Sequence, residues 1–66
     1  MLIRDKINTR LKDLDVLLKE NLHLRNPELV FDRIADITKF WTILGDAERD
    51  YLNAARDAVR DGNVWK

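Results

Sequence analysis

The segment from residue 27 to residue 44 carries apolar side chains around more than half of a helical circumference. Its central face is formed by residues that recur at spacings of three and four: Val30, Ile34, Ile37, Trp41 and Leu44. Leu29 and Phe40 extend this face on one side, and Phe31 extends it on the other. A helix that is apolar over so wide an arc must pack against two neighbours at once. The segment is therefore predicted to be the central helix of an all-α domain.

The limits of this helix follow from residues with known capping preferences. Asn26 is expected to cap its N-terminus, with Pro27 at the first helical position and Glu28 in the first turn. Gly45 is expected to end the helix in a left-handed backbone conformation, and Gly45 or Asp46 to cap the next helix. Because this connection is so short, the helices on its two sides must be antiparallel or sharply angled neighbours.

A second amphipathic pattern predicts a first helix over about residues 2–22. Its apolar stripe consists of Ile3, Ile7, Leu11, Leu14, Leu18 and Leu22. Val16 falls on the opposite, charged side of this helix. Asn21 has two interpretations: a polar residue that fixes helix register or oligomeric state, or a residue at a fraying C-terminus.

A third helix is predicted over about residues 46–61, ended by Gly62 and Asn63. Its buried side is formed by Tyr51, Leu52, Ala55, Ala58 and Val59. Its small residues let the helix approach the aromatic surface of Phe31, Phe40 and Trp41 closely. The three amphipathic helices are expected to form a small up-down-up bundle, with residues 1–66 as a single domain.

A bundle of this size has little stability to spare. A chain of 66 residues buries only about 60% of the surface that its unfolded form exposes, and the absence of Cys excludes disulfides. Several apolar residues exceed what so small a core hides: Val16, Leu24, Ile43, Val64 and Trp65. We therefore expect that oligomerisation completes the bundle.

The charges exclude several classes of partner. Twelve basic and twelve acidic residues cancel, so no overall field draws the chain to nucleic acid or to an anionic membrane. The charged N-terminus, with Arg4, Asp5 and Lys6, is unlike a secretory signal. No apolar run approaches the roughly 20 residues that a membrane span needs. A cytoplasmic protein is expected.

Residues for catalysis are scarce, and we expect a protein that is not an enzyme. The chain has no Ser and no Cys, so the usual activated nucleophiles are missing. His23 is the only histidine, and a structural or incidental role is expected for it. The carboxylates of Glu28, Asp32 and Asp36 share one helix face, but their spacing is not that of a calcium-binding loop. No metal, cofactor or small-molecule substrate is therefore expected.

The polar side of the predicted helix 46–61 is sorted by charge into two lines. Arg49, Asn53, Arg56 and Arg60 form one line, and Asp46, Asp50, Asp57 and Asp61 form the line beside it. Such a face is either a solvated surface with ion pairs such as Asp57 with Arg60, or a docking surface whose charges select a partner.

The candidate partner-binding residues are the first of these lines together with the C-terminal apolar pair: Arg49, Asn53, Arg56, Arg60, Val64 and Trp65. Trp65 is expected either to fold back on the bundle or to anchor a partner, since Trp is common at interface hot spots.

Helices 27–44 and 46–61 with their tight connection also invite comparison with a DNA-binding helix-turn-helix. A recognition helix is basic near its N-terminus, whereas this one begins with Asp46, Glu48 and Asp50. A nucleic-acid-associated regulator that uses the Arg49, Arg56 and Arg60 line is therefore the alternative function.

The C-terminal half of the chain carries a family resemblance. Residues 31–65, and especially the run from Phe40 to Leu52, resemble small uncharacterised proteins encoded by tailed bacteriophages of marine cyanobacteria. The resemblance implies an accessory protein of the host cytoplasm or a minor virion component, and it carries no binding residues. The leading hypothesis is a non-catalytic protein-protein interaction module or small adaptor that associates with a protein partner or with another copy of itself.

Overall fold

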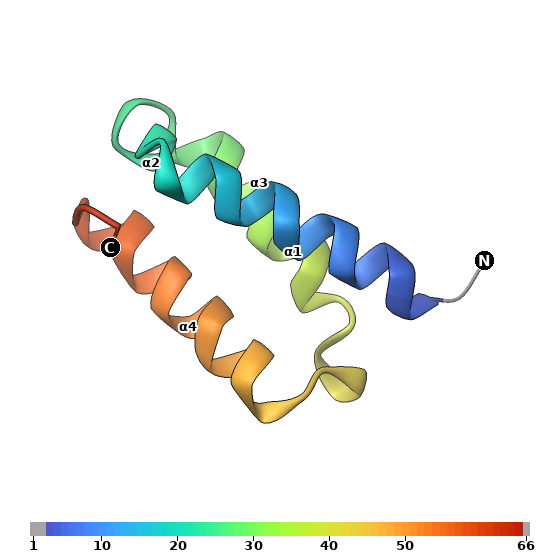
Figure 1. Cartoon of the computed structure of the whole chain (residues 1–66). Coiled ribbons are helices and arrows are strands. Elements are labelled where there is room, and N and C mark those ends of the chain that lie inside the picture. Colours follow the sequence, from blue (N-terminus) through green and yellow to red (C-terminus); the bar gives the residue numbers. More distant parts are fainter. Residues whose placement is uncertain (1–2, 66) are drawn as a thin grey trace.

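The computed structural model describes residues 3–65, and this part of the chain is all α-helical (Figure 1). Its elements are α1 (Ile3–Lys19), α2 (Leu22–Arg25), α3 (Pro27–Thr38), the 3-10 turn η1 (Trp41–Ile43) and α4 (Asp46–Asp61). The predicted all-α class is confirmed. Residue 2, the predicted first helical residue, lies outside the described part of the chain. The predicted ends of the first two helices, at residues 22 and 44, are wrong.

The first helix ends at Lys19 because Asn21 leaves the helical conformation. Asn21 has φ 55° and ψ 34°, and its N–H donates to the carbonyl of Leu18 at 2.9 Å. Asn tolerates this left-handed region better than most residues with a side chain. The turn at Asn21 separates α1 from the short α2, so the predicted first helix ends three residues early and a short helix forms in the segment that follows it.

The start of α3 follows the prediction, and its end does not. The Asn26 side chain accepts a hydrogen bond from the Leu29 N–H at 3.4 Å, and Pro27 occupies the first turn. The hydroxyl of Thr38 donates to the Ile34 carbonyl at 2.8 Å, a local bond that competes with helix continuation. The chain then tightens into η1, which still places Leu44 in the core at 5% exposure. The apolar spacing therefore continues although the α-helical backbone does not.

The two glycines that bound α4 have different roles. Gly45 is extended, with φ −75° and ψ 165°, so the left-handed conformation predicted for it is wrong. Its N–H donates to the Glu48 side chain at 2.8 Å, which is half of a capping box. Gly62 is left-handed at φ 69°, and the next N–H, that of Asn63, donates to the Ala58 carbonyl at 2.9 Å. This Schellman-type ending confirms the predicted stop.

The core lies around α3, which packs against α1, α2 and α4. Its buried residues come from the three long helices and from the connection after η1: Ile7, Leu14, Leu18, Val30, Ile34, Ile37, Leu44, Leu52, Ala55 and Val59. In Figure 1 α1 lies in front of α3 and α4 lies below them, with α3 running against the direction of the other two. The two outer helices make few direct contacts with each other.

Trp41 does not occupy the place predicted for it. It lies on η1 and is only partly buried, so it does not share the sandwiched position of Ile34 and Ile37 on α3. The Arg49 guanidinium lies over its ring, 5.6 Å from the centroid. Trp41 therefore covers the edge of the core at the connection between α3 and α4.

The core assignment predicts different costs for two leucines. Leu14 is fully buried in α1, whereas Leu24 in α2 is 44% exposed. We expect Leu14→Ala to lower the free energy of unfolding by about 2 to 5 kcal/mol, because it leaves a cavity. Leu24→Ala should cost less than about 1 kcal/mol. Urea denaturation followed by circular dichroism measures both, and equal losses would contradict the assignment.

Candidate functional site

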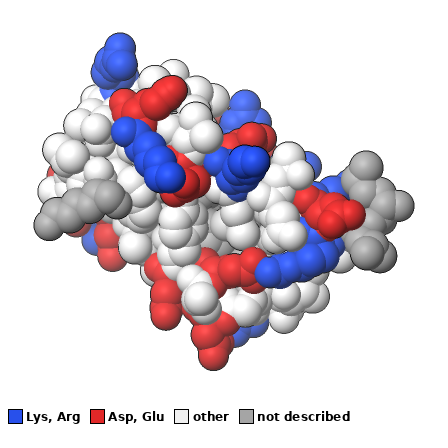
Figure 2. All heavy atoms as spheres, viewed as in Figure 1, with Lys and Arg blue, Asp and Glu red and all other residues white. Residues whose placement is uncertain are grey.

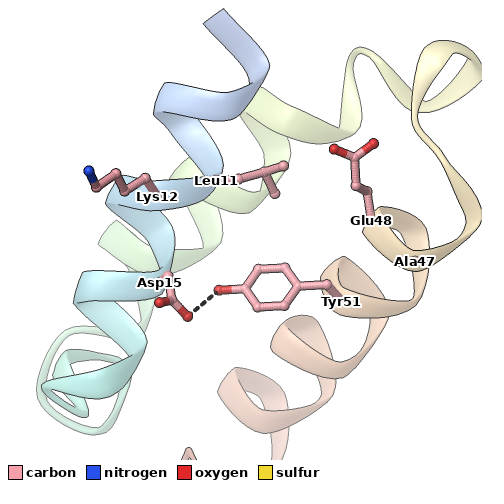
Figure 3. A pocket seen from close by; sticks show the side chains of 6 residues that line it. All are labelled: Leu11, Lys12, Asp15, Ala47, Glu48 and Tyr51. Carbon is pink, nitrogen blue, oxygen red and sulfur yellow. Dashed lines mark hydrogen bonds between the residues drawn. The ribbon is translucent and has the colours of Figure 1, made fainter. Parts of the chain in front are cut away.

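A groove of about 360 Å³ lies between α1 and α4 on the side away from α3 (Figure 3). It is lined by three residues from each helix: Leu11, Lys12, Asp15, Ala47, Glu48 and Tyr51. The apolar part of the lining comes from Leu11, Ala47 and the ring of Tyr51, while Asp15 points across the groove toward the Tyr51 hydroxyl and Lys12 points away from α4. We call this feature the α1–α4 groove.

The groove stays open because long polar side chains, and not close packing, connect its two helices. Arg4 on α1 forms a salt bridge with Glu48 on α4. The Tyr51 hydroxyl donates to Asp15 Oδ1 at 3.1 Å, and this bond crosses the groove (Figure 3). These bridges tie α1 to α4 at a distance at which their backbones do not pack.

The ionisable groups of the groove stabilise one another. The Lys19 ammonium, 3.0 Å from the Asp15 carboxylate, lowers the pKa of Asp15, and the Tyr51 hydroxyl adds to this effect. Arg4 and the Gly45 N–H lower the pKa of Glu48. Burial, together with the Asp15 charge, raises the pKa of Tyr51. At neutral pH the groove therefore holds charged carboxylates and a protonated phenol that donates to one of them.

The C-terminal segment folds back and closes one end of the groove region. The Trp65 ring meets Tyr51 edge to face, with centroids 5.6 Å apart, and the Trp65 N–H donates to the Asn21 side chain at 3.1 Å. His23 is 1% exposed and its Nε2 lies 2.6 Å from the Asn63 carbonyl. Since a carbonyl only accepts, Nε2 carries the proton there, and Nδ1 has no partner among the described residues. His23 is thus buried and contacts the C-terminal segment through Nε2.

The surface continues along α4 beyond the groove. A second hollow is lined by Ala54, Asp57, Ala58, Asn63, Val64 and Trp65. Ala47 and Ala54 are both exposed and stand seven residues apart, so they share one face of α4. In the view of Figure 2 an uncharged strip runs between the two helices, and acidic atoms gather along its lower side. Small residues on such a strip allow close approach of another helix.

The predicted partner-binding residues divide between separate surfaces. Val64, which is 64% exposed, and Trp65 border the second hollow, with Trp65 folded back. Arg56 lines a different hollow, formed with α3 residues such as Phe31 and Ala35. Asn53 is exposed. The structure therefore does not bring the arginine line together with the C-terminal apolar pair.

Two of the arginines are already engaged within the chain. The Nε of Arg49 donates to the Trp41 carbonyl at 3.0 Å, and this residue fastens η1 to α4. Arg60 pairs with Asp57 and with Asp61, each at 3.2 Å. The predicted pair of Asp57 with Arg60 is thus confirmed. These contacts agree with the solvated-face interpretation for the end of α4.

The acidic face of Glu28, Asp32 and Asp36 shows no grouping of side chains, within residues 3–65, that would form a metal site. Asp36 contacts Arg10 at 3.6 Å and Lys39 at 3.5 Å. Within residues 3–65, no three His, Asp or Glu side chains are grouped so that they could hold a metal ion. No helix in this range is long and apolar enough to cross a membrane.

Sequence reasoning missed the groove itself. Leu11 was expected in the core stripe of its helix, and no contact between α1 and α4 was predicted for Asp15 or Tyr51. One available signal was the pair Ala47 and Ala54, whose spacing puts two small residues on one exposed face.

Comparisons with known proteins add no relative. No protein-family model matches the chain, and no curated protein or solved structure is detectably similar to it.

The bridges across the groove predict a dependence of stability on acid. Because the pKa values of Asp15 and Glu48 are lowered by folding, both carboxylates add stability above their unfolded pKa values, about pH 4. That stability is lost as the pH falls through the folded-state values. We expect the double variant Asp15→Asn, Glu48→Gln to be less stable at pH 6 and to lose less stability by about pH 3. Urea denaturation at both pH values measures this, and equal losses in variant and wild type would contradict it.

Proposed function

We propose that this chain is a non-catalytic protein-interaction module that binds an amphipathic helix in the α1–α4 groove. The observation that carries the proposal is that α1 and α4 both pack on α3 while leaving an apolar-floored groove between themselves. Helix-in-groove binding is a recurrent mode of recognition, in which an apolar face enters a hydrophobic channel between helices.

The direction of its walls and the chemistry of its lining suit the groove to a helix. Its walls are α1 and α4, which run in the same direction, so a helix of the partner can lie along both (Figure 1). The small side chain of Ala47 permits close approach, and the Tyr51 ring and Leu11 offer apolar contact. Polar groups at the margin, including Lys12, can fix the orientation of the bound helix.

The same proposal includes the arrangement of the helices that was predicted from the sequence. The three long helices form an up-down-up bundle in which the place of a fourth helix, between α1 and α4, is left for a partner. The partly exposed apolar residues that border it support this view, since they gain cover only when that place is filled. In this role the chain would act as a small accessory or adaptor protein, as its resemblance to cyanophage proteins implies.

The alternative of a nucleic-acid-associated regulator has less support. Arg49 is engaged with Trp41, and Arg60 is paired with two carboxylates. Within residues 3–65, Arg56 is the one arginine of this line that forms neither an ion pair nor a side-chain hydrogen bond. Nucleic-acid binding depends on several basic contacts that release counterions, and a single free arginine does not supply them.

A displayed library of amphipathic helical peptides tests the proposal. Peptides selected on the wild-type chain should share apolar residues at positions i, i+3 or i+4, and i+7. Ala47→Phe fills the groove and should weaken their binding on the order of tenfold or more, equivalent to at least about 1.4 kcal/mol.

The matched control is Ala35→Phe, which adds the same ring to an exposed alanine on α3, away from the groove. It should leave binding unchanged. Peptides that bind both variants equally, or that lack the helical spacing, would refute the groove as the binding site. Circular dichroism confirms that both variants are folded.

A further inference from the structure

The two edges of the α1–α4 groove carry opposite charges. The α1 edge presents Lys12 and Lys19, which are seven residues apart and both exposed. The α4 edge presents Asp50 and Asp57, which follow Ala47 and Ala54 by three residues and therefore lie on the outer side of the alanine face. Lys12 and Asp50 form no ion pair within residues 3–65, whereas Lys19 is paired with Asp15 at 3.0 Å and Asp57 with Arg60 at 3.2 Å. The groove is thus self-complementary in charge.

The heights of these charges along the helices also match. The bond between Asp15 and Tyr51 sets these two residues at one level. Lys12 lies three residues before Asp15, and Asp50 lies one residue before Tyr51. Lys19 lies four residues after Asp15, and Asp57 lies six after Tyr51. Each lysine is therefore offset from its aspartate by the same two residues, about 3 Å along a helix.

We infer that a second copy of this chain covers the α1–α4 groove with its own groove, an inference that rests on the proposed function of this groove as an interaction site. The two copies are related by a two-fold axis parallel to α1 and α4, so that α1 of each copy packs beside α4 of the other. Such an axis preserves heights along the helices. It places Lys12 near Asp50 of the partner subunit and Lys19 near Asp57 of the partner subunit.

The other simple arrangement is disfavoured by charge. A two-fold axis across the helices would set α4 against α4 and bring the two lines of aspartates together, which costs energy in any interface. The parallel axis instead buries Leu11, Ala47 and Tyr51 of both copies in the middle of four helices. Because the interface is isologous, each favourable contact occurs twice.

Charge reversal tests this arrangement. Sedimentation equilibrium over a wide concentration range should show a wild-type dimer. Lys12→Glu alone and Asp50→Lys alone should each weaken dimerisation on the order of tenfold, since each creates two like-charged contacts per dimer. An equimolar mixture of the two variants should recover wild-type affinity as a heterodimer, because every contact in that species again joins opposite charges.

The matched controls reverse charges elsewhere on the surface. Lys6→Glu on α1 and Asp32→Lys on α3 are exposed and are not among the groove-lining residues, so dimerisation should be unchanged. Circular dichroism verifies that each variant is folded. The proposed arrangement would be overturned if Lys12→Glu and Asp50→Lys left the dimer affinity unchanged, or if the mixture of the two variants did not regain it.

Failure of this inference is distinguishable from failure of the proposed function. A chain that stays monomeric at millimolar concentration refutes the second copy as occupant. If selected helical peptides still bind the wild type and lose affinity on Ala47→Phe, the groove remains a site for a helix of another protein. If they do not, both proposals fall.

Discussion

The burial of one face of α3 is the constraint on which the rest of the structure depends. Val30, Ile34 and Ile37 are essentially inaccessible to water, and they lie on α3, the one helix within residues 3–65 that packs against each of the others. A twelve-residue helix spans only about 18 Å, so it offers limited room for its neighbours. The positions of α1 and α4 are therefore set by their packing on α3, and the α1–α4 groove is the space that this packing leaves between them.

Much of the fold could be predicted because its signals are local. The cap at Asn26 and the stop at Gly62 depend on hydrogen bonds within a few residues, and both are in the structure. The ends of the first two helices could not be predicted from apolar spacing. Leu44 stays buried whether the backbone before it is an α-helix or a 3-10 turn, so its position in the pattern does not report the difference.

The candidate groove was beyond sequence reasoning for a different reason. Its residues are far apart in the chain, and Asp15 and Tyr51 meet only because α3 separates their helices by a particular distance. The arginine line was visible in the sequence, but the engagement of Arg49 with η1 was not, because the helix was expected to continue through Trp41. Periodicity identifies which face a residue occupies, and tertiary structure decides what that face meets.

The polar bridges between α1 and α4 also have a kinetic consequence. The partners in Arg4–Glu48 and Asn21–Trp65 are separated by 44 residues, whereas α3 is joined to its neighbours by short connections. Contacts across long loops form late in folding because closing the loop costs more entropy. We therefore expect the contacts between α1 and α4 to form last and their transient separation to cost less than opening the core around α3. Amide protection should accordingly be greatest in α3 and weaker at the ends of the helices that these bridges connect.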